Sequence, residues 1–219
     1  IVAPQPLTSL AAPVVSAAAA LLIQTGHEGG LNLSNGSTYI TGIGTVYNAE
    51  RSETVKAALM AGADRVTANT STTANITDYG TGGHGTANGL DERYGAGQVN
   101  IANSYRILTG GEQRSVQSGG SDISLFGFDH ANIGGLSGSG RTASYFFNAQ
   151  SPATLFASLV WNVSVSNNAQ LTTQLHNLDL FLYDVTTNSL VVSSASFLDN
   201  TENIYYRLLA GNRYELRVT

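Results

Sequence analysis

The chain has no cysteine among its 219 residues, and this absence excludes disulfides and thiolate metal sites. Charged residues are scarce, at 11% of the chain. The 10 basic and 15 acidic residues give a formal net charge of −5, which argues against nucleic acid as the main partner. No uninterrupted apolar run reaches about 18 residues, so this count predicts no membrane span.

Hydrophobic residues are plentiful, and at 42% of the chain they are sufficient for a real core. Low charge combined with 24 glycines and many Ser, Thr and Asn residues is typical of a β-rich extracellular protein. The chain begins at Ile1 without a methionine and ends in Glu215–Thr219, a stretch that alternates like the middle of a strand. We therefore expect a piece of a longer secreted protein.

The segment from Thr8 to Leu22 predicts a turn that leads into a helix. Thr8 and Ser9 have hydroxyls that can accept the free amide hydrogens of a first helical turn, and Pro13 is tolerated near that turn. The Ala-rich run that follows is apolar on every face, which predicts a buried helix. A serine at the N-terminus of such a helix lies where the dipole favours developing negative charge.

This stretch, Thr8-Ser9-Leu10-Ala11-Ala12-Pro13-Val14, resembles the serine-bearing helix of the subtilisin-like serine proteases, whose usual pattern is Gly-Thr-Ser-x-Ala-Ala-Pro-x-Val. The resemblance implies that Ser9 is the catalytic nucleophile of a peptide-hydrolysing enzyme. One position departs from the family pattern, because Leu7 stands where the family has a glycine.

Two further segments of the first half carry no chemistry in our interpretation. Residues 26–45 lack a helical period and predict a surface insertion, whereas residues 48–62 predict a second helix. His84-Gly85-Thr86 resembles the histidine motif of the same protease family, but in that family the histidine precedes the serine. We expect a glycine-rich loop with an exposed histidine.

A second resemblance to the same family lies in Tyr94-Gly95-Ala96-Gly97-Gln98-Val99-Asn100 and the helix expected after it. It is similar to the Gly-x-Gly-x-Val-Asn turn and last helix of a subtilisin-like catalytic domain, with Asn100 able to cap the helix. Residues 1–108 are therefore expected to form the C-terminal part of such a domain, and residues 109–120 a linker.

Residues 121–219 differ from the first part of the chain, because their sequence predicts short strands separated by turns. Strands are expected at 144–148, 154–165, 178–183, 190–193, 204–209 and 214–218, which is typical of a β-sandwich with Trp161 in its core. The segments 178–184, 199–203 and 209–214 resemble the pre-peptidase C-terminal domain, a jelly-roll-like sandwich of secreted bacterial proteases.

Four carboxylates of this region are candidate Ca²⁺ ligands, since related sandwiches bind calcium near strand ends and carboxylate oxygen is the chemistry Ca²⁺ prefers. They are Asp179, Asp184, Asp199 and Glu202. The alternative is that these acids form turns and protect strand edges.

The predicted fold class is α+β in two parts: the helical C-terminal portion of a subtilisin-like α/β domain, with its parallel sheet mostly missing, and an antiparallel β-sandwich. The family's Asp and His segments precede its serine and are absent here, so the chain alone is expected to be inactive. Because the parallel sheet is mostly missing, residues 1–108 are expected to expose apolar surface. The sandwich is expected to be able to fold alone. The predicted function is that of a secreted, bacterial serine endopeptidase acting on protein or peptide substrates. The alternative is a non-catalytic binding or accessory protein with a degenerate protease remnant.

Overall fold

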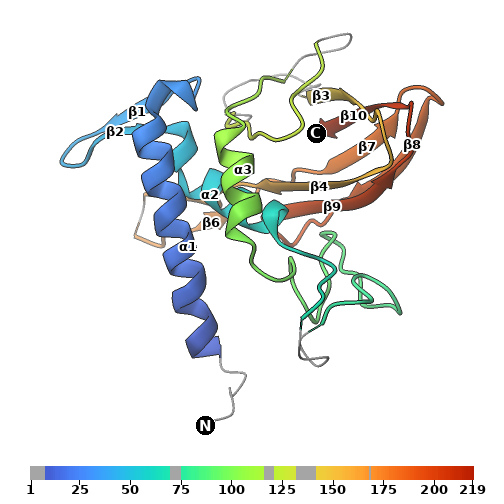
Figure 1. The fold of residues 1–219 in the computed structure, drawn as a ribbon. Coiled ribbons are helices and arrows are strands. Elements are labelled where there is room, and N and C mark those ends of the chain that lie inside the picture. The colour runs from blue at the N-terminus through green and yellow to red at the C-terminus, as the bar shows by residue number, and fades with distance from the viewer. Residues whose placement is uncertain (1–7, 70–74, 116–120, 132–141, 168) are drawn as a thin grey trace.

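A computed structural model describes residues 8–69, 75–115, 121–131, 142–167 and 169–219 as a mixed α+β structure with antiparallel sheets (Figure 1). In chain order its helices and strands are α1 (Thr8–Gly29), the 3-10 helix η1 (Gly30–Asn32), β1 (Ser37–Ile40), β2 (Gly44–Tyr47), the 3-10 helix η2 (Asn48–Glu50), α2 (Ser52–Gly62), α3 (Ile101–Thr109), β3 (Ala143–Asn148), β4 (Ala153–Val160), β5 (Ser164–Val165), β6 (Thr173–Gln174), β7 (Leu180–Asp184), β8 (Ser189–Ser194), β9 (Thr201–Leu208) and β10 (Arg213–Val218).

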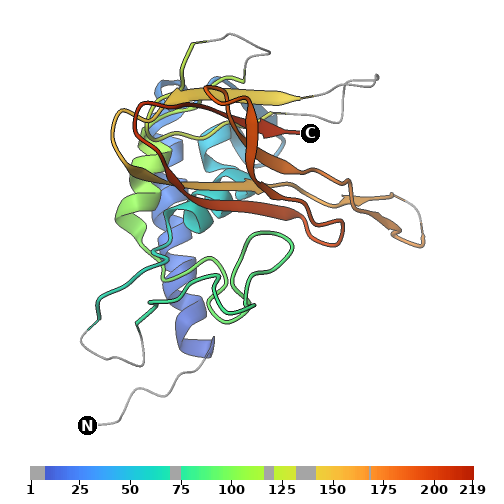
Figure 2. The ribbon, with the colours of Figure 1, turned by 90° about the vertical axis from the view of Figure 1, so that its right-hand side faces the viewer.

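The helix α1 is longer and more exposed than its sequence predicts. It continues to Gly29 instead of ending near Gly26, and its buried residues are Ala18, Leu22 and Gly26. Residues 8–17 are all exposed, and this half of the helix projects from the body (Figures 1 and 2). The prediction of a buried helix therefore does not hold within this chain, whereas the expected exposure of apolar surface does.

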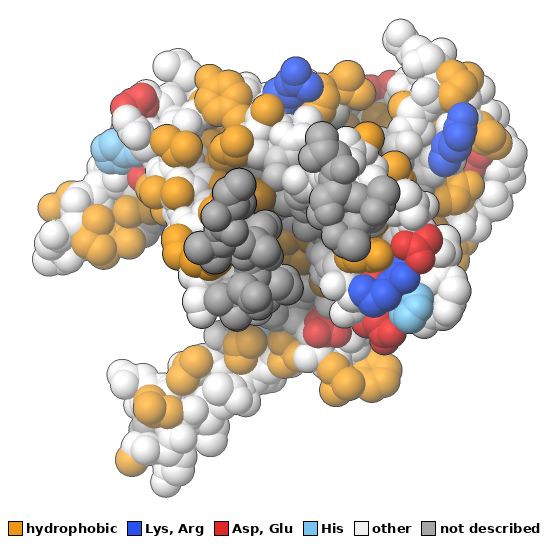
Figure 3. Space-filling view, turned by 60° about the horizontal axis from the view of Figure 1, so that its bottom comes forward, with side chains coloured by type: hydrophobic (Ala, Val, Ile, Leu, Met, Phe, Trp, Pro, Cys, Tyr) orange, Lys and Arg blue, Asp and Glu red, His pale blue; other side chains and the backbone are white. Residues whose placement is uncertain are grey.

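The predicted surface insertion, residues 26–45, is more regular than its sequence predicts, because it contains the end of α1, the 3-10 helix η1 and most of a β-hairpin. Strands β1 and β2 pair antiparallel from Ser37 opposite Tyr47 to Ile40 opposite Gly44. The hairpin projects from the body, with hydrophobic side chains on its exposed surface (Figures 1 and 3). Tyr39 and Ile43 are exposed near its tip.

The helices share a small core. Leu22 of α1, Val55 of α2 and Leu108 of α3 are buried together with Ala49 and Phe128. These positions explain why the three helices pack together, since each contributes apolar side chains to the shared core.

Glu112 and Gln113, which follow α3, connect the helices to the second half of the chain. Glu112 pairs with Phe128 in an isolated β-bridge, and its backbone N–H donates to the carbonyl of Leu33 at 2.9 Å. Gln113 donates to the carbonyl of Phe128 at 2.6 Å. The beginning of the predicted linker, residues 109–115, is thus bonded to both halves.

The second half has the antiparallel strands that the sequence predicts. One sheet has the order β3-β10-β7-β8, and a second, two-stranded sheet pairs β4 with β9 (Figures 1 and 2). This arrangement is compatible with a β-sandwich. The predicted strand over 154–165 is divided in two, because the chain leaves the sheet at buried Trp161, whose indole Nε1 donates to the carbonyl of His176 at 2.8 Å.

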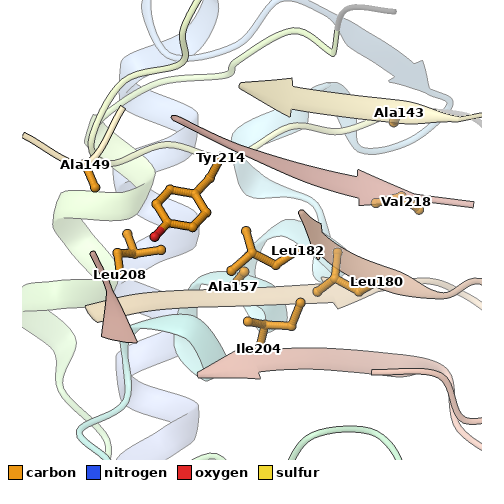
Figure 4. Close-up of a cluster of buried hydrophobic side chains, with 9 residues drawn as sticks. All are labelled: Ala143, Ala149, Ala157, Leu180, Leu182, Ile204, Leu208, Tyr214 and Val218. Atoms are coloured by element: carbon orange, nitrogen blue, oxygen red, sulfur yellow. The ribbon is translucent and has the colours of Figure 1, made fainter. Parts of the chain in front are cut away.

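The sandwich core lies between these two sheets (Figure 4). Alternation along β10 explains it: Tyr214 and Val218 are buried, whereas Arg213 and Arg217 lie on the other face. The buried cluster comprises Ala143, Ala149, Ala157, Leu180, Leu182, Ile204, Leu208, Tyr214 and Val218.

Candidate functional site

Ser9, the expected nucleophile, lies in the first turn of α1 and is exposed to solvent. A helix of 22 residues is about 33 Å long, so Ser9 is far from the end of α1 that meets η1 and the hairpin. The position offers the free amides and the dipole of a helix N-terminus, as expected. Leu7, where the family pattern has glycine, lies outside the described residues.

Two histidines of the described chain, His27 and His84, pair with carboxylates. His27 Nδ1 lies 3.0 Å from Glu50 Oε2, and His84 Nδ1 lies 2.6 Å from Glu92 Oε1. A serine hydroxyl needs a base within hydrogen-bond reach to become a nucleophile. Within the described part of the chain, the structure does not assemble a triad around Ser9.

The flank of α1 beside its buried face is apolar and uncovered. Leu10, Val14, Ala17 and Leu21 recur at spacings of 4, 3 and 4 residues, which places them on one stripe of the helix. Leu10, Val14 and Leu21 are each more than half exposed. Burying such side chains is worth about 1.5 to 3 kcal/mol each, so this stripe favours a covering partner.

The segment Thr8–Asn32 is also long and apolar enough to cross a membrane, by length and composition alone, and 17% of its apolar window is buried. The count of uninterrupted apolar residues missed this property, because Ser16 interrupts the run without lowering its mean hydropathy much. A core helix of a larger protein and an N-terminal signal sequence have the same composition.

The glycine turn before α3 adopts a conformation that requires glycine. Gly97 has φ +115°, and a Cβ there would lie 2.4 Å from the carbonyl oxygen of Asp64. Asn100 caps α3, since its side chain accepts the N–H of Asn103 at 3.1 Å. The predicted cap is confirmed, and α3 packs beside α1 through Leu108 and Leu22.

The loop that contains His84 is held by a buried carboxylate. Asp91 accepts the backbone N–H groups of Gly80 and Arg93, and it pairs with the Arg93 guanidinium at 3.0 Å. The hydrogen bonds from Arg93 hold the pKa of Asp91 well below its usual range. His84 lies on the partly exposed surface of this loop, where its Nδ1 pairs with Glu92.

The four candidate calcium ligands do not form one cluster. Asp179 exchanges backbone hydrogen bonds with Thr219 at the start of β7, whereas Asp184 pairs with Tyr214 at the end of that strand. Five residues of a strand span roughly 16 Å, so these two carboxylates lie too far apart to share an ion. Ser196 bonds both remaining acids, through its N–H to Glu202 and through its hydroxyl to Asp199, each at 2.7 Å.

The environments of these acids also differ electrostatically. Burial raises the pKa of Glu202, and the nearby carboxylates of Asp179 and Asp199 raise it further. Burial acts in the same direction on Asp184, but hydrogen bonds from Asn212 and from backbone amides outweigh it and lower its pKa. Among the described residues no group of three or more His, Cys, Asp or Glu side chains could hold a metal ion, so the Ca²⁺ site stays a prediction without structural support.

The structure brings together one Ser–His pair that the sequence did not indicate. Ser164 Oγ and His176 Nε2 are 3.2 Å apart on the exposed surface beside β5 and β6. A catalytic pair also needs a group that orients the imidazole, and within the described residues no carboxylate bonds this ring. The pair therefore does not form a candidate triad.

The most unusual buried group is the side chain of Arg65, just beyond α2. It is 1% exposed, and its guanidinium has no hydrogen-bond partner among the residues that the structure describes. The carbon Cζ lies 5.4, 5.2 and 5.6 Å from the ring centroids of Tyr79, Phe156 and Tyr205. Cation–π contacts of this kind contribute about 0.5 to 2 kcal/mol each, against a cost of several kcal/mol for burying an unpaired charge.

We call these three rings and Arg65 the arginine cage. Sequence reasoning missed it, because an arginine in a polar loop ordinarily predicts an exposed side chain. Comparison with models of known families and with curated proteins found no match to this chain.

Proposed function

We propose that this chain is the C-terminal portion of a secreted, bacterial subtilisin-like serine endopeptidase, in which Ser9 is the nucleophile and residues 121–219 form an accessory β-sandwich. The observation that carries the proposal is the arrangement of α1. It places a Thr-Ser pair in the exposed first turn of an Ala-rich helix whose apolar stripe, Leu10, Val14, Ala17 and Leu21, has no cover in the described chain.

Two further features support this proposal. In the protease family the serine-bearing helix packs against a parallel sheet, and an uncovered apolar stripe is the surface such a sheet would require. The turn at Gly95–Gly97 leads into α3, and α3 packs beside α1 through Leu108. The two helices that begin at the segments resembling the family thus pack against each other.

In the proposed reaction, the Ser9 hydroxyl attacks the carbonyl carbon of a peptide bond and forms an acyl-enzyme. A histidine takes the hydroxyl proton and returns it to the leaving amine, and water then releases the acyl group. The Ser9 backbone N–H, at the helix N-terminus, contributes to stabilising the oxyanion. The described residues supply the nucleophile and the helix dipole, and the base has to come from another segment.

The test is labelling with a fluorophosphonate probe, which reacts only with an activated serine. We expect no labelling of the 219-residue chain by itself. We expect the longest natural form of the protein to be labelled, and we expect Ser9→Ala to abolish that labelling. Ser16→Ala is the matched control, since Ser16 is an exposed serine two turns further along α1.

Two results would contradict the proposal. The first is labelling that persists in Ser9→Ala. The second is a folded, longest natural form that the probe does not label, which would favour the non-catalytic alternative in which the sandwich binds a partner and the protease segment is a remnant.

A further inference from the structure

We infer that the sandwich braces the helical half of the chain, so that the strands β4 and β9 and the helices α2 and α3 fold and unfold as one unit. This role is distinct from that of a tethered binding module, and it does not depend on whether Ser9 is reactive. Three sets of contacts across the two halves carry the inference.

The first set is the arginine cage. Arg65 and Tyr79 belong to the helical half, whereas Phe156 lies on β4 and Tyr205 lies opposite it on β9. The Arg65 guanidinium is 1% exposed and has no hydrogen-bond partner within the described ranges, so the ring faces around it are what offsets the cost of burying its charge. If the two halves separated, Arg65 would lose its cation–π contacts with Phe156 and Tyr205, and the apolar rings would be exposed to water.

The cage is also built from both sides. The ring centroids of Phe156 and Tyr205 are 5.2 Å apart, and those of Tyr79 and Tyr205 are 5.7 Å apart with an edge-on geometry. The backbone beside Arg65 is fixed, because Asp64 exchanges two hydrogen bonds with Gln98 at 2.8 and 2.9 Å. A side chain held in this way transmits a displacement of either half to the other.

The second set consists of reciprocal amide contacts at β9. The side chain of Asn203 donates to the carbonyl of Asn88 at 3.0 Å, and the side chain of Asn88 donates to the hydroxyl of Thr201 at 3.2 Å. Asn88, Thr201 and Asn203 are all buried. Buried amides that lose these partners leave unsatisfied polar groups, so this contact resists partial opening.

The third set is the direct packing of helix on sheet. Helix α2 contacts β4, and Figure 1 shows α2 beside β4. The side chain of Asn162, which follows β4, also donates to Glu53 of α2 at 2.5 Å. Phe128, from the second half, completes the small core of α1, α2 and α3. Side chains of each half are therefore buried against the other half, as Phe128 is in the core of the helices and Arg65 is beside β4 and β9.

The experiment is hydrogen exchange of the full chain read by mass spectrometry across a urea series. Peptides from α2 and α3 report on the helical half, and peptides from β4 and β9 report on the sandwich. We expect the protection of both sets to collapse at the same urea concentration. Two separate midpoints would overturn the inference.

Arg65→Ala removes the centre of the cage. We expect it to lower the protection of both sets by the same factor, at least about tenfold, which corresponds to about 1.4 kcal/mol. Arg207→Ala is the matched control, because Arg207 is an exposed arginine on β9 two residues beyond Tyr205, and we expect less than about a twofold change.

Loss of protection in the helices alone, with β4 and β9 unchanged, would overturn the inference, as would the reverse. Should Arg65→Ala prevent folding, Arg65→Lys provides the same test, because it keeps the charge and the aliphatic stem but has a smaller face against the rings. We expect a smaller loss that is again equal in both sets, and an unequal loss would count against the brace.

Discussion

Replacing Gly89 by alanine should destabilise the protein through contact with the sandwich. Gly89 has φ +73°, and a Cβ built there would lie 1.8 Å from the carbonyl oxygen of Asn203. The left-handed backbone costs a non-glycine residue about 1 to 2 kcal/mol. Displacing the Asn203 backbone would also break the hydrogen bonds that join Asn88 to Asn203 and to Thr201, at about 1 kcal/mol each. The expected loss in free energy of unfolding is about 3 to 4 kcal/mol.

Gly83→Ala separates backbone strain from contact. Gly83 has φ +87°, but nothing lies within 4 Å of the position its Cβ would take, so we expect about 1 to 2 kcal/mol. Urea unfolding followed by the fluorescence of Trp161, the single tryptophan, measures both variants on one scale. If Gly89→Ala costs no more than Gly83→Ala, the close approach of this loop to β9 is refuted.

Two further predictions concern packing and pH. Leu22→Ala, in the core of the helices, should cost about 2 to 5 kcal/mol, whereas its exposed neighbour Leu21→Ala should stay within about 0.5 kcal/mol in the same urea assay; equal costs would refute the assigned face of α1. The raised pKa of Glu202 means that the folded state holds its proton more tightly, so stability falls as pH rises above the ordinary value of 4.5. Glu202→Gln removes the buried charge and its repulsion from Asp179 and Asp199, so the variant should have a higher thermal midpoint than the wild type at pH 7 but not below pH 4. A higher midpoint at both pH values would show that the charge of Glu202 is not the cause.

Local pattern was sufficient wherever one face of an element is buried. The alternation at Glu215–Thr219 predicted a strand, and the Asn100 cap predicted the start of α3. The β1–β2 hairpin was missed, because β1 is exposed throughout and β2 is only half-buried, so neither strand alternates between buried and exposed residues. Its signal was weaker: β-branched and aromatic residues on both sides of the turn at Gly42.

Contacts between distant segments could not be predicted from the sequence. Nothing around Arg65 indicates that rings from three separate parts of the chain surround it. The candidate calcium ligands show the same limit, since Asp179 and Asp184 are close in sequence but lie at the two ends of β7. The placement of Ser9 at a helix N-terminus was predicted by local pattern, but its surroundings depend on which segment covers α1.

The exposed apolar stripe of α1 couples the free energy of unfolding of this protein to the binding of any segment that covers the stripe. Any segment that binds the stripe in the folded state but not in the unfolded one acts as a ligand, and it adds about 2.7 kcal/mol when its concentration is 100 times its dissociation constant. A covering segment on the same chain would act at a fixed, high effective concentration. Binding of such a segment to the four side chains of this stripe, Leu10, Val14, Ala17 and Leu21, would therefore raise the thermal midpoint of the protein.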